Sequence, residues 1–61
     1  MNVLLKWKRE TKGAHLYQEV NSDGEELNSN NGAIIQSLYV RKTAMKDSTN
    51  PPQTLEFDLD I

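Results

Sequence analysis

The stretch TLEFDLDI, residues 54–61, is the feature that most restricts the fold of this chain. Apolar and acidic residues alternate along it, and successive side chains of a β-strand point to opposite faces. A helix would instead scatter the apolar residues Leu55, Phe57, Leu59 and Ile61 around its circumference. The stretch therefore predicts a half-buried strand with an acidic outer face.

Three earlier segments also favour strands. The first alternates Val3, Leu5 and Trp7 with more polar neighbours, and we expect a hairpin turn at residues 11–13, where Gly13 offers a positive φ. Residues 14–20 form the second strand, whose faces the pattern does not settle. Residues 33–41, AIIQSLYVR, are rich in β-branched and aromatic residues and predict the third.

In the third strand the alternation assigns two faces. We expect Ile34, Leu38 and Val40 on one face and Ile35, Tyr39 and Arg41 on the other. Residues 42–46, KTAMK, are typical of a single helical turn. Residues 21–32 predict a polar loop with turns at its two Asx-Gly dipeptides, and residues 47–53 predict an irregular link containing two prolines.

The predicted fold class is all-β: one domain over residues 1–61, built on a small antiparallel sheet of four strands. No long amphipathic helix is available to cover the sheet. The sheet must therefore curl, as a meander or partly closed barrel, or stack on a second copy of the chain. A chain of 61 residues without cysteine buries little surface, which favours completion by dimerisation.

Composition narrows the function classes. The net charge of −2 argues against a dedicated nucleic-acid binder, although charges of opposite sign occur in alternating blocks. We expect no membrane span and a cytoplasmic location, since the sequence has no long apolar run, no cysteine and no N-glycosylation motif.

Catalytic constellations are missing from the sequence. His15 is the sole histidine, there is no cysteine, and the serines have no recognisable nucleophile context. The loop at residues 21–32 lacks the acidic spacing of a calcium loop, and the three glycines are too far apart for a phosphate loop. We therefore predict no enzyme activity, no cofactor and no metal.

One mixed basic and aromatic surface is the candidate site. The alternation of the first three strands suggests a shared outer face, whereas Trp7 shares the parity of Val3 and Leu5 and belongs to the core. Cations interleaved with aromatic rings on a sheet bind single-stranded nucleic acid, but such residues also pair across strands for structural reasons. The candidate residues are Lys6, Lys8, His15, Tyr17, Tyr39 and Arg41.

The segments RETKGAHLYQEV, LYVRKTAM and PPQTLEFDLDI resemble those of a group of short, uncharacterised all-β proteins from bacteria and bacteriophages. The resemblance rests on an ETKG-like turn, the LYVRKxA segment and the final alternating strand after proline. It implies a phage or mobile-element accessory protein in a bacterial host, and brings no established activity or functional residues. In that group the segment before the third strand is shorter, so residues 21–32 are expected to be an insertion.

The sequence thus predicts a small non-enzymatic interaction protein that binds a protein partner, with a second copy of the chain as a further candidate, through exposed strand edges and the face with Tyr17, Tyr39 and Arg41. The alternative is a single-stranded nucleic-acid-binding module that uses Lys6, Lys8 and the same three residues.

Overall fold

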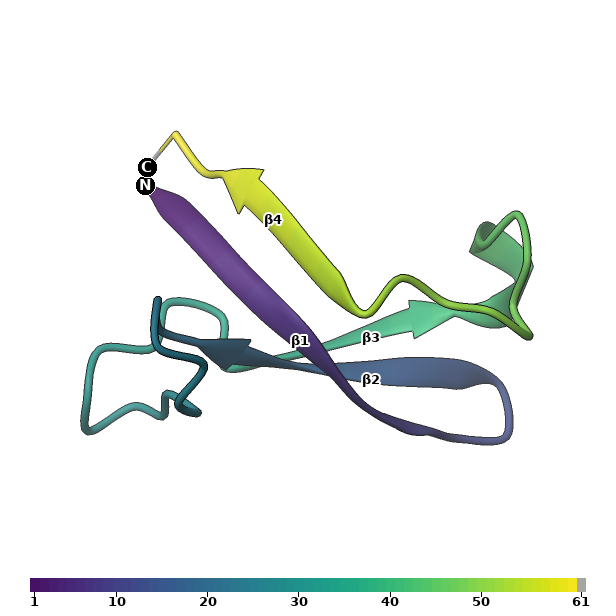
Figure 1. Ribbon diagram of the computed structural model, residues 1–61, viewed down its shortest axis with the longest axis horizontal. Helices are drawn as coiled ribbons and strands as arrows, with labels where there is room; N and C mark the ends of the chain where they lie inside the picture. The colour runs from purple at the N-terminus through teal and green to yellow at the C-terminus, as the bar shows by residue number, and fades with distance from the viewer. Residues whose placement is uncertain (61) are drawn as a thin grey trace.

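The protein is a curled half-barrel of four antiparallel strands, seen in a computed structural model that describes residues 1–60 (Figure 1). The strands are β1 (Asn2–Glu10), β2 (Ala14–Val20), β3 (Ser37–Arg41) and β4 (Thr54–Asp58), and a 3-10 turn, η1 (Lys42–Ala44), follows β3. The all-β prediction is confirmed, and of the two predicted shapes the structure adopts the partly closed barrel.

The spatial order of the strands is β3-β2-β1-β4. The chain makes three successive antiparallel strands and then returns by a long link to place β4 beside β1, which is the order of a Greek key. The return brings the segment after β4 beside the N-terminus (Figure 1): the N–H of Leu59 donates to the carbonyl of Met1 at 2.7 Å. The two free edges of the sheet are therefore β3 and β4.

Cross-strand pairing sorts the side chains onto two faces. Directly opposite residues share a face, as Trp7 and Tyr17 do, or Leu5 and Leu55. The core face carries Val3, Leu5, Trp7, His15, Tyr17, Glu19, Leu38, Val40, Leu55 and Phe57. The outer face carries Leu4, Lys6, Lys8, Arg9, Ala14, Leu16, Gln18, Val20, Ser37, Tyr39, Arg41, Thr54, Glu56 and Asp58.

The core is small. Within residues 1–60, the core cluster of buried side chains consists of Val3, Leu5 and Tyr17, and half-buried apolar residues of β3, β4 and the link pack around them. Ile35, Met45 and Leu59 join this ring from outside the strands. The predicted apolar face of the last strand is confirmed for Leu55, Phe57 and Leu59, although the strand itself ends at Asp58, and Ile61 lies outside the described residues.

A β-bulge interrupts β1 at Lys8. Trp7 lies opposite Tyr17 and Arg9 lies opposite Leu16, so Lys8 is the extra residue and the alternation of faces shifts by one. Arg9 consequently joins the outer face, where simple alternation from Val3 would have placed it in the core. Bulges also increase strand twist, in keeping with the steep crossing of β1 over β2 and β3 in Figure 1.

The predicted turn at residues 11–13 is confirmed, but its mechanism differs from the prediction. Gly13 does not use a positive φ; the positive-φ glycines are Gly24 and Gly32, each in a predicted Asx-Gly turn. Thr11 closes the hairpin instead, because its N–H and hydroxyl both donate to the carbonyl of Ala14, at 2.8 and 3.0 Å.

The third strand is shorter than predicted and its first residues were assigned to the wrong faces. Residues 33–36 are not a strand, since Gln36 has φ of +73° and breaks the alternation. Ile35 therefore packs against the core, whereas Ile34 is 37% exposed. From Leu38 to Arg41 the predicted faces are confirmed.

Strand β2 is the centre of the structure, because all seven of its residues are buried. β1 and β3 flank it, and Glu26 also forms a bridge with Val20 where β3 no longer covers that edge. Its polar side chains bond to the main chain of the two long connections.

The predicted helical turn at residues 42–46 is confirmed as η1.

Candidate interaction surface

The outer face brings together four of the six predicted site residues. Lys6 and Lys8 come from β1, and Tyr39 and Arg41 come from β3. All four are exposed, and the ring of Tyr39 is the most open aromatic surface, at 57%. Between them lie the buried residues of β2, with Leu16 directly opposite Tyr39 and Ala14 directly opposite Arg41.

The structure does not place His15 and Tyr17 on that face, so this part of the prediction is wrong. Both are on the core face, opposite Val40 and Leu38, and they are 2% and 0% exposed. The reason is the pairing of Trp7 with Tyr17, which puts Tyr17 and, two residues earlier on the same strand, His15 on the core face and so gives β2 the parity that the sequence left open. Neither residue is available to a macromolecular partner.

His15 and Tyr17 instead hold the link between η1 and β4. The Tyr17 hydroxyl donates to the carbonyl of Pro52 at 2.6 Å, and burial raises the pKa of this phenol, which keeps it a donor. The Trp7 indole N–H donates to His15 Nδ1 at 3.0 Å. Indole nitrogen only donates, so Nδ1 accepts and Nε2 carries the proton that is donated to the carbonyl of Ser48, 2.7 Å away.

Glu19 is a residue that the sequence analysis did not single out. Its carboxylate is 3% exposed, and one oxygen accepts the N–H groups of Ile34, Ile35 and Gln36 at 2.9, 2.7 and 2.8 Å. Burial raises the pKa of this carboxyl, but the three N–H donors outweigh burial and hold the pKa below its usual value. A buried, ionised glutamate thus shapes the positive-φ turn before β3.

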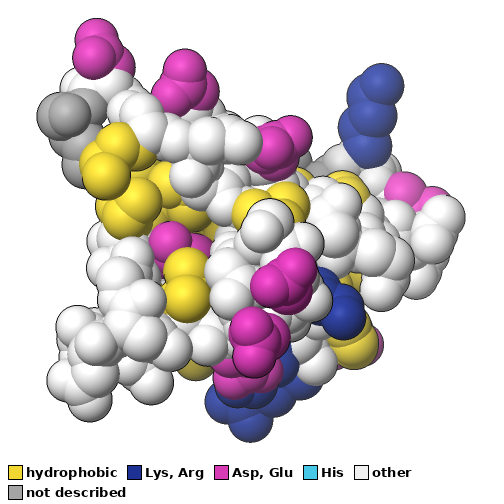
Figure 2. Space-filling view, turned by 60° about the vertical axis from the view of Figure 1, so that its left-hand side comes forward, with side chains coloured by type: hydrophobic (Ala, Val, Ile, Leu, Met, Phe, Trp, Pro, Cys, Tyr) yellow, Lys and Arg dark blue, Asp and Glu magenta, His cyan; other side chains and the backbone are white. Residues whose placement is uncertain are grey.

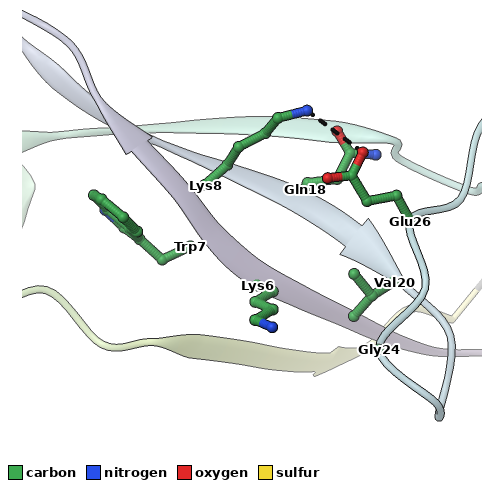
Figure 3. Close-up of a pocket in the computed structure, with 7 residues that line it drawn as sticks. All are labelled: Lys6, Trp7, Lys8, Gln18, Val20, Gly24 and Glu26. Atoms are coloured by element: carbon green, nitrogen blue, oxygen red, sulfur yellow. Dashed lines mark hydrogen bonds and ion pairs between the residues drawn. The ribbon is translucent and has the colours of Figure 1, made fainter.

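A shallow hollow of about 270 Å³ lies on the outer face between β1 and the loop after β2 (Figure 3). Lys8 points toward Gln18 and Glu26 across it, and its ammonium is 3.5 Å from the Glu26 carboxylate. Trp7 points away on the other side of β1 in the same view. The pairing with Glu26 partly neutralises Lys8, which weakens it as a phosphate contact.

Charges of both signs mix over the surface. In Figure 2 acidic side chains follow the upper rim, while acidic and basic side chains lie together lower down, and apolar side chains reach the surface between them. The view therefore shows no uninterrupted basic patch. A second hollow, of about 300 Å³, lies beside Tyr39 and Arg41 at the turn end of the β1–β2 hairpin.

The free edge of β3 is the other notable feature of this surface. The N–H of Glu19 donates to the carbonyl of Gln36 and the N–H of Lys42 to the carbonyl of Gly13, at 2.8 and 3.0 Å. Main-chain groups of alternate residues point to opposite sides of a strand. Even-numbered residues therefore bond to β2, and Tyr39 and Arg41 present their N–H and C=O groups away from the sheet. Among the described residues, the N–H and C=O of Tyr39 and the N–H of Arg41 have no partner in β2, whereas the carbonyl of Arg41, the N-cap residue of η1, serves the first turn of that 3-10 segment.

Within the described residues, no three histidine, cysteine, aspartate or glutamate side chains lie close enough to share a metal ion. None of the helical structure in residues 1–60 is long and apolar enough to cross a bilayer. Comparisons of the chain with protein-family models, with curated proteins and with solved structures find no match.

Proposed function

We propose that this chain is a small non-enzymatic interaction protein that binds an extended segment of a protein partner along the free edge of β3. The observation that supports the proposal is the row of outward-facing main-chain groups at Tyr39 and Arg41, flanked by their exposed side chains. Added strands gain affinity from main-chain hydrogen bonds and specificity from alternate side chains.

The side chains at this edge favour an acidic segment. Arg41 is exposed beside the edge, and Arg9 lies on the same face, opposite Leu16, which in turn lies opposite Tyr39. A carboxylate on the added strand, directly opposite Arg41, would gain an attractive cross-strand contact. Tyr39 offers a rigid, amphipathic contact surface of the kind enriched at protein interfaces.

Blocking the edge without breaking the sheet tests this proposal. Of the main-chain groups, proline at position 39 removes only an N–H that faces outward, so Tyr39→Pro keeps every bond between β3 and β2, while it also removes the tyrosine ring from this edge. Thr54→Pro, which makes the same change at the edge of β4, is the matched control. Displayed random octapeptides are selected on immobilised wild type and both variants, after circular dichroism confirms that all three are folded.

We expect the wild type and Thr54→Pro to enrich segments that alternate apolar and acidic residues, and Tyr39→Pro to enrich none. The proposal is wrong if the wild type enriches no peptide, or if Tyr39→Pro enriches the same ones. The biological setting that we propose, an accessory protein of a phage or mobile element acting in a bacterial cytoplasm, is supported by the resemblance in sequence alone.

Single-stranded nucleic acid is the second candidate ligand, favoured by the shared exposure of Lys6, Arg9, Tyr39 and Arg41 on one face. Tyr39 is the only exposed aromatic residue of that face within residues 1–60, so stacking would rest on one ring. The test is the anisotropy of labelled oligonucleotides at about 50 and 200 mM salt. Binding that collapses at the higher salt would favour this candidate, and no binding at the lower salt would remove it.

A further inference from the structure

We propose that a second copy of this chain supplies the acidic segment: β4 of one copy pairs antiparallel with β3 of another. The inference rests on the proposed function, because it concerns the same edge of β3, and it names the occupant. The basis is that the two free edges of the sheet are complementary. Their main-chain hydrogen-bonding groups, the faces on which their side chains lie and the charges of those side chains all match.

The hydrogen bonding of β4 mirrors that of β3. The N–H of Trp7 donates to the carbonyl of Gln53 at 2.8 Å, and the N–H of Leu59 to that of Met1 at 2.7 Å. Odd-numbered residues of β4 therefore bond to β1, and Thr54, Glu56 and Asp58 present their main-chain groups outward. Both edges thus expose the main chain of residues whose side chains lie on the outer face.

Because the outward-pointing main-chain groups of both edges belong to outer-face residues, the outer and core faces of two copies match across the seam. In an antiparallel pair, two residues that exchange both main-chain hydrogen bonds lie directly opposite, with side chains on one face. Joining the edges therefore places outer-face residues beside outer-face residues and apolar ones beside apolar ones. A one-residue slip would reverse this arrangement, so only every second register is allowed.

Charge selects one register among those allowed. With Arg41 opposite Glu56, the guanidinium meets a carboxylate on the outer face, and Tyr39 lies opposite Asp58. On the core face the same register sets Val40 opposite Phe57 and Leu38 opposite Leu59. All four of these apolar residues are half-buried in the single chain and would be covered further at the seam. Glu56 already accepts a hydrogen bond from Asn2 through Oε2, which leaves Oε1 for Arg41.

The competing pairing of β4 with β4 of another copy is disfavoured. Centred on Glu56, it would bring two carboxylates directly opposite, and like charges at opposed positions destabilise a sheet. Strand direction also agrees with the β3–β4 seam, because directions alternate along the order β3-β2-β1-β4 and the outer strands run oppositely. A copy added at either edge continues the alternation, and two seams between two curled copies close the sheet about a twofold axis.

Disulfide trapping tests the pairing of β3 with β4 directly, because the chain has no cysteine of its own. Directly opposed residues of this type have Cα atoms about 5.5 Å apart, within the span of a disulfide. Protein carrying Tyr39→Cys is mixed with protein carrying Asp58→Cys and oxidised. We expect the mixed disulfide to form, and a Tyr39→Cys mixture with Asp23→Cys, in the loop after β2, to give none.

Exchanging the charges of Arg41 and Glu56 tests the seam at equilibrium. The association of the whole chain is measured by sedimentation over a concentration series. We expect the wild type to self-associate, and Arg41→Glu to weaken the association about tenfold through lost attraction and new repulsion at two seams. Adding Glu56→Arg to the same chain restores an ion pair with the two charges exchanged, and it should recover most of the lost association. Assemblies of two or more copies, with the mixed disulfide, support the seam.

A monomeric wild type without mixed disulfide, or a disulfide formed equally well by Asp58→Cys alone, overturns the inference. The proposed function is judged separately by the displayed peptides. If peptides are enriched at the β3 edge while the chain stays monomeric, the edge binds a foreign segment and only the second-copy inference fails. If neither occurs, both fail.

Discussion

Replacing the buried carboxylate of β2 should be among the most damaging single-atom changes in this protein. In Glu19→Gln an oxygen that accepts three main-chain N–H groups, at 2.7–2.9 Å, changes from a carboxylate oxygen to an amide oxygen. Hydrogen bonds to charged groups contribute about 1.5–3 kcal/mol and neutral ones about 0.5–1.5 kcal/mol. The three bonds share one acceptor and are not additive, so we expect a loss of about 2–3 kcal/mol.

Urea unfolding followed by the fluorescence of Trp7, the sole tryptophan, measures this loss. Glu25→Gln is the matched control: the same chemical change at an exposed loop position, expected to stay within about 0.5 kcal/mol of the wild type. If Glu19→Gln is no more destabilising than Glu25→Gln, the three N–H bonds do not hold residues 34–36 as described.

The same carboxylate predicts a pH dependence. Its pKa is lowered in the folded state, so its contribution is fully present above the ordinary glutamate pKa and is lost as pH falls through the lowered folded value. The stability gap between the wild type and Glu19→Gln should therefore be constant near neutral pH and shrink on acidification. A gap that widens in acid would contradict the sign of this argument.

Three further substitutions and one control test the packing and turns by the same urea assay. Tyr17→Phe removes the hydrogen bond to Pro52 and should cost about 1 kcal/mol, whereas Tyr39→Phe, at an exposed ring, should change little. Leu5→Ala empties part of a three-residue core and should cost about 2–5 kcal/mol, enough to leave much of a domain this size unfolded without denaturant. Gly32→Ala should cost about 1 kcal/mol, because φ of +101° strains a side chain even though the space around it is open.

Alternation was sufficient to predict the fold class and most of the strands. It succeeded wherever a strand has one apolar and one polar face, as in β4 and in the segment from Leu38 to Arg41. It failed in β2, where both faces are buried and hydrophobicity no longer distinguishes them. His15 and Tyr17 were assigned to the outer face for that reason.

Two other differences arise from interactions that a linear pattern does not contain. The bulge at Lys8 shifts the parity of β1 after Trp7, which is how Arg9 reaches the outer face. The positive φ of Gln36 is fixed by the carboxylate of Glu19, which is 17 residues away in sequence. Aromatic residues were predicted as surface features because tyrosine is amphipathic, yet Tyr17 satisfies its hydroxyl inside the fold.

The polar side chains of β2 have a consequence for how freely the rest of the sequence can change. His15, Tyr17 and Gln18 bond to main-chain carbonyls of Ser48, Pro52 and Leu27, and Glu19 bonds to main-chain N–H groups of residues 34–36. In each of these hydrogen bonds the partner residue contributes only its main chain, so the bond does not depend on the partner's side chain. Both connections are thus shaped by β2 while their own residues remain replaceable, so a saturation library should tolerate few changes across residues 14–20 and many in the two connections. The loop at residues 21–32 is accordingly a place to graft new binding sequences onto this small scaffold.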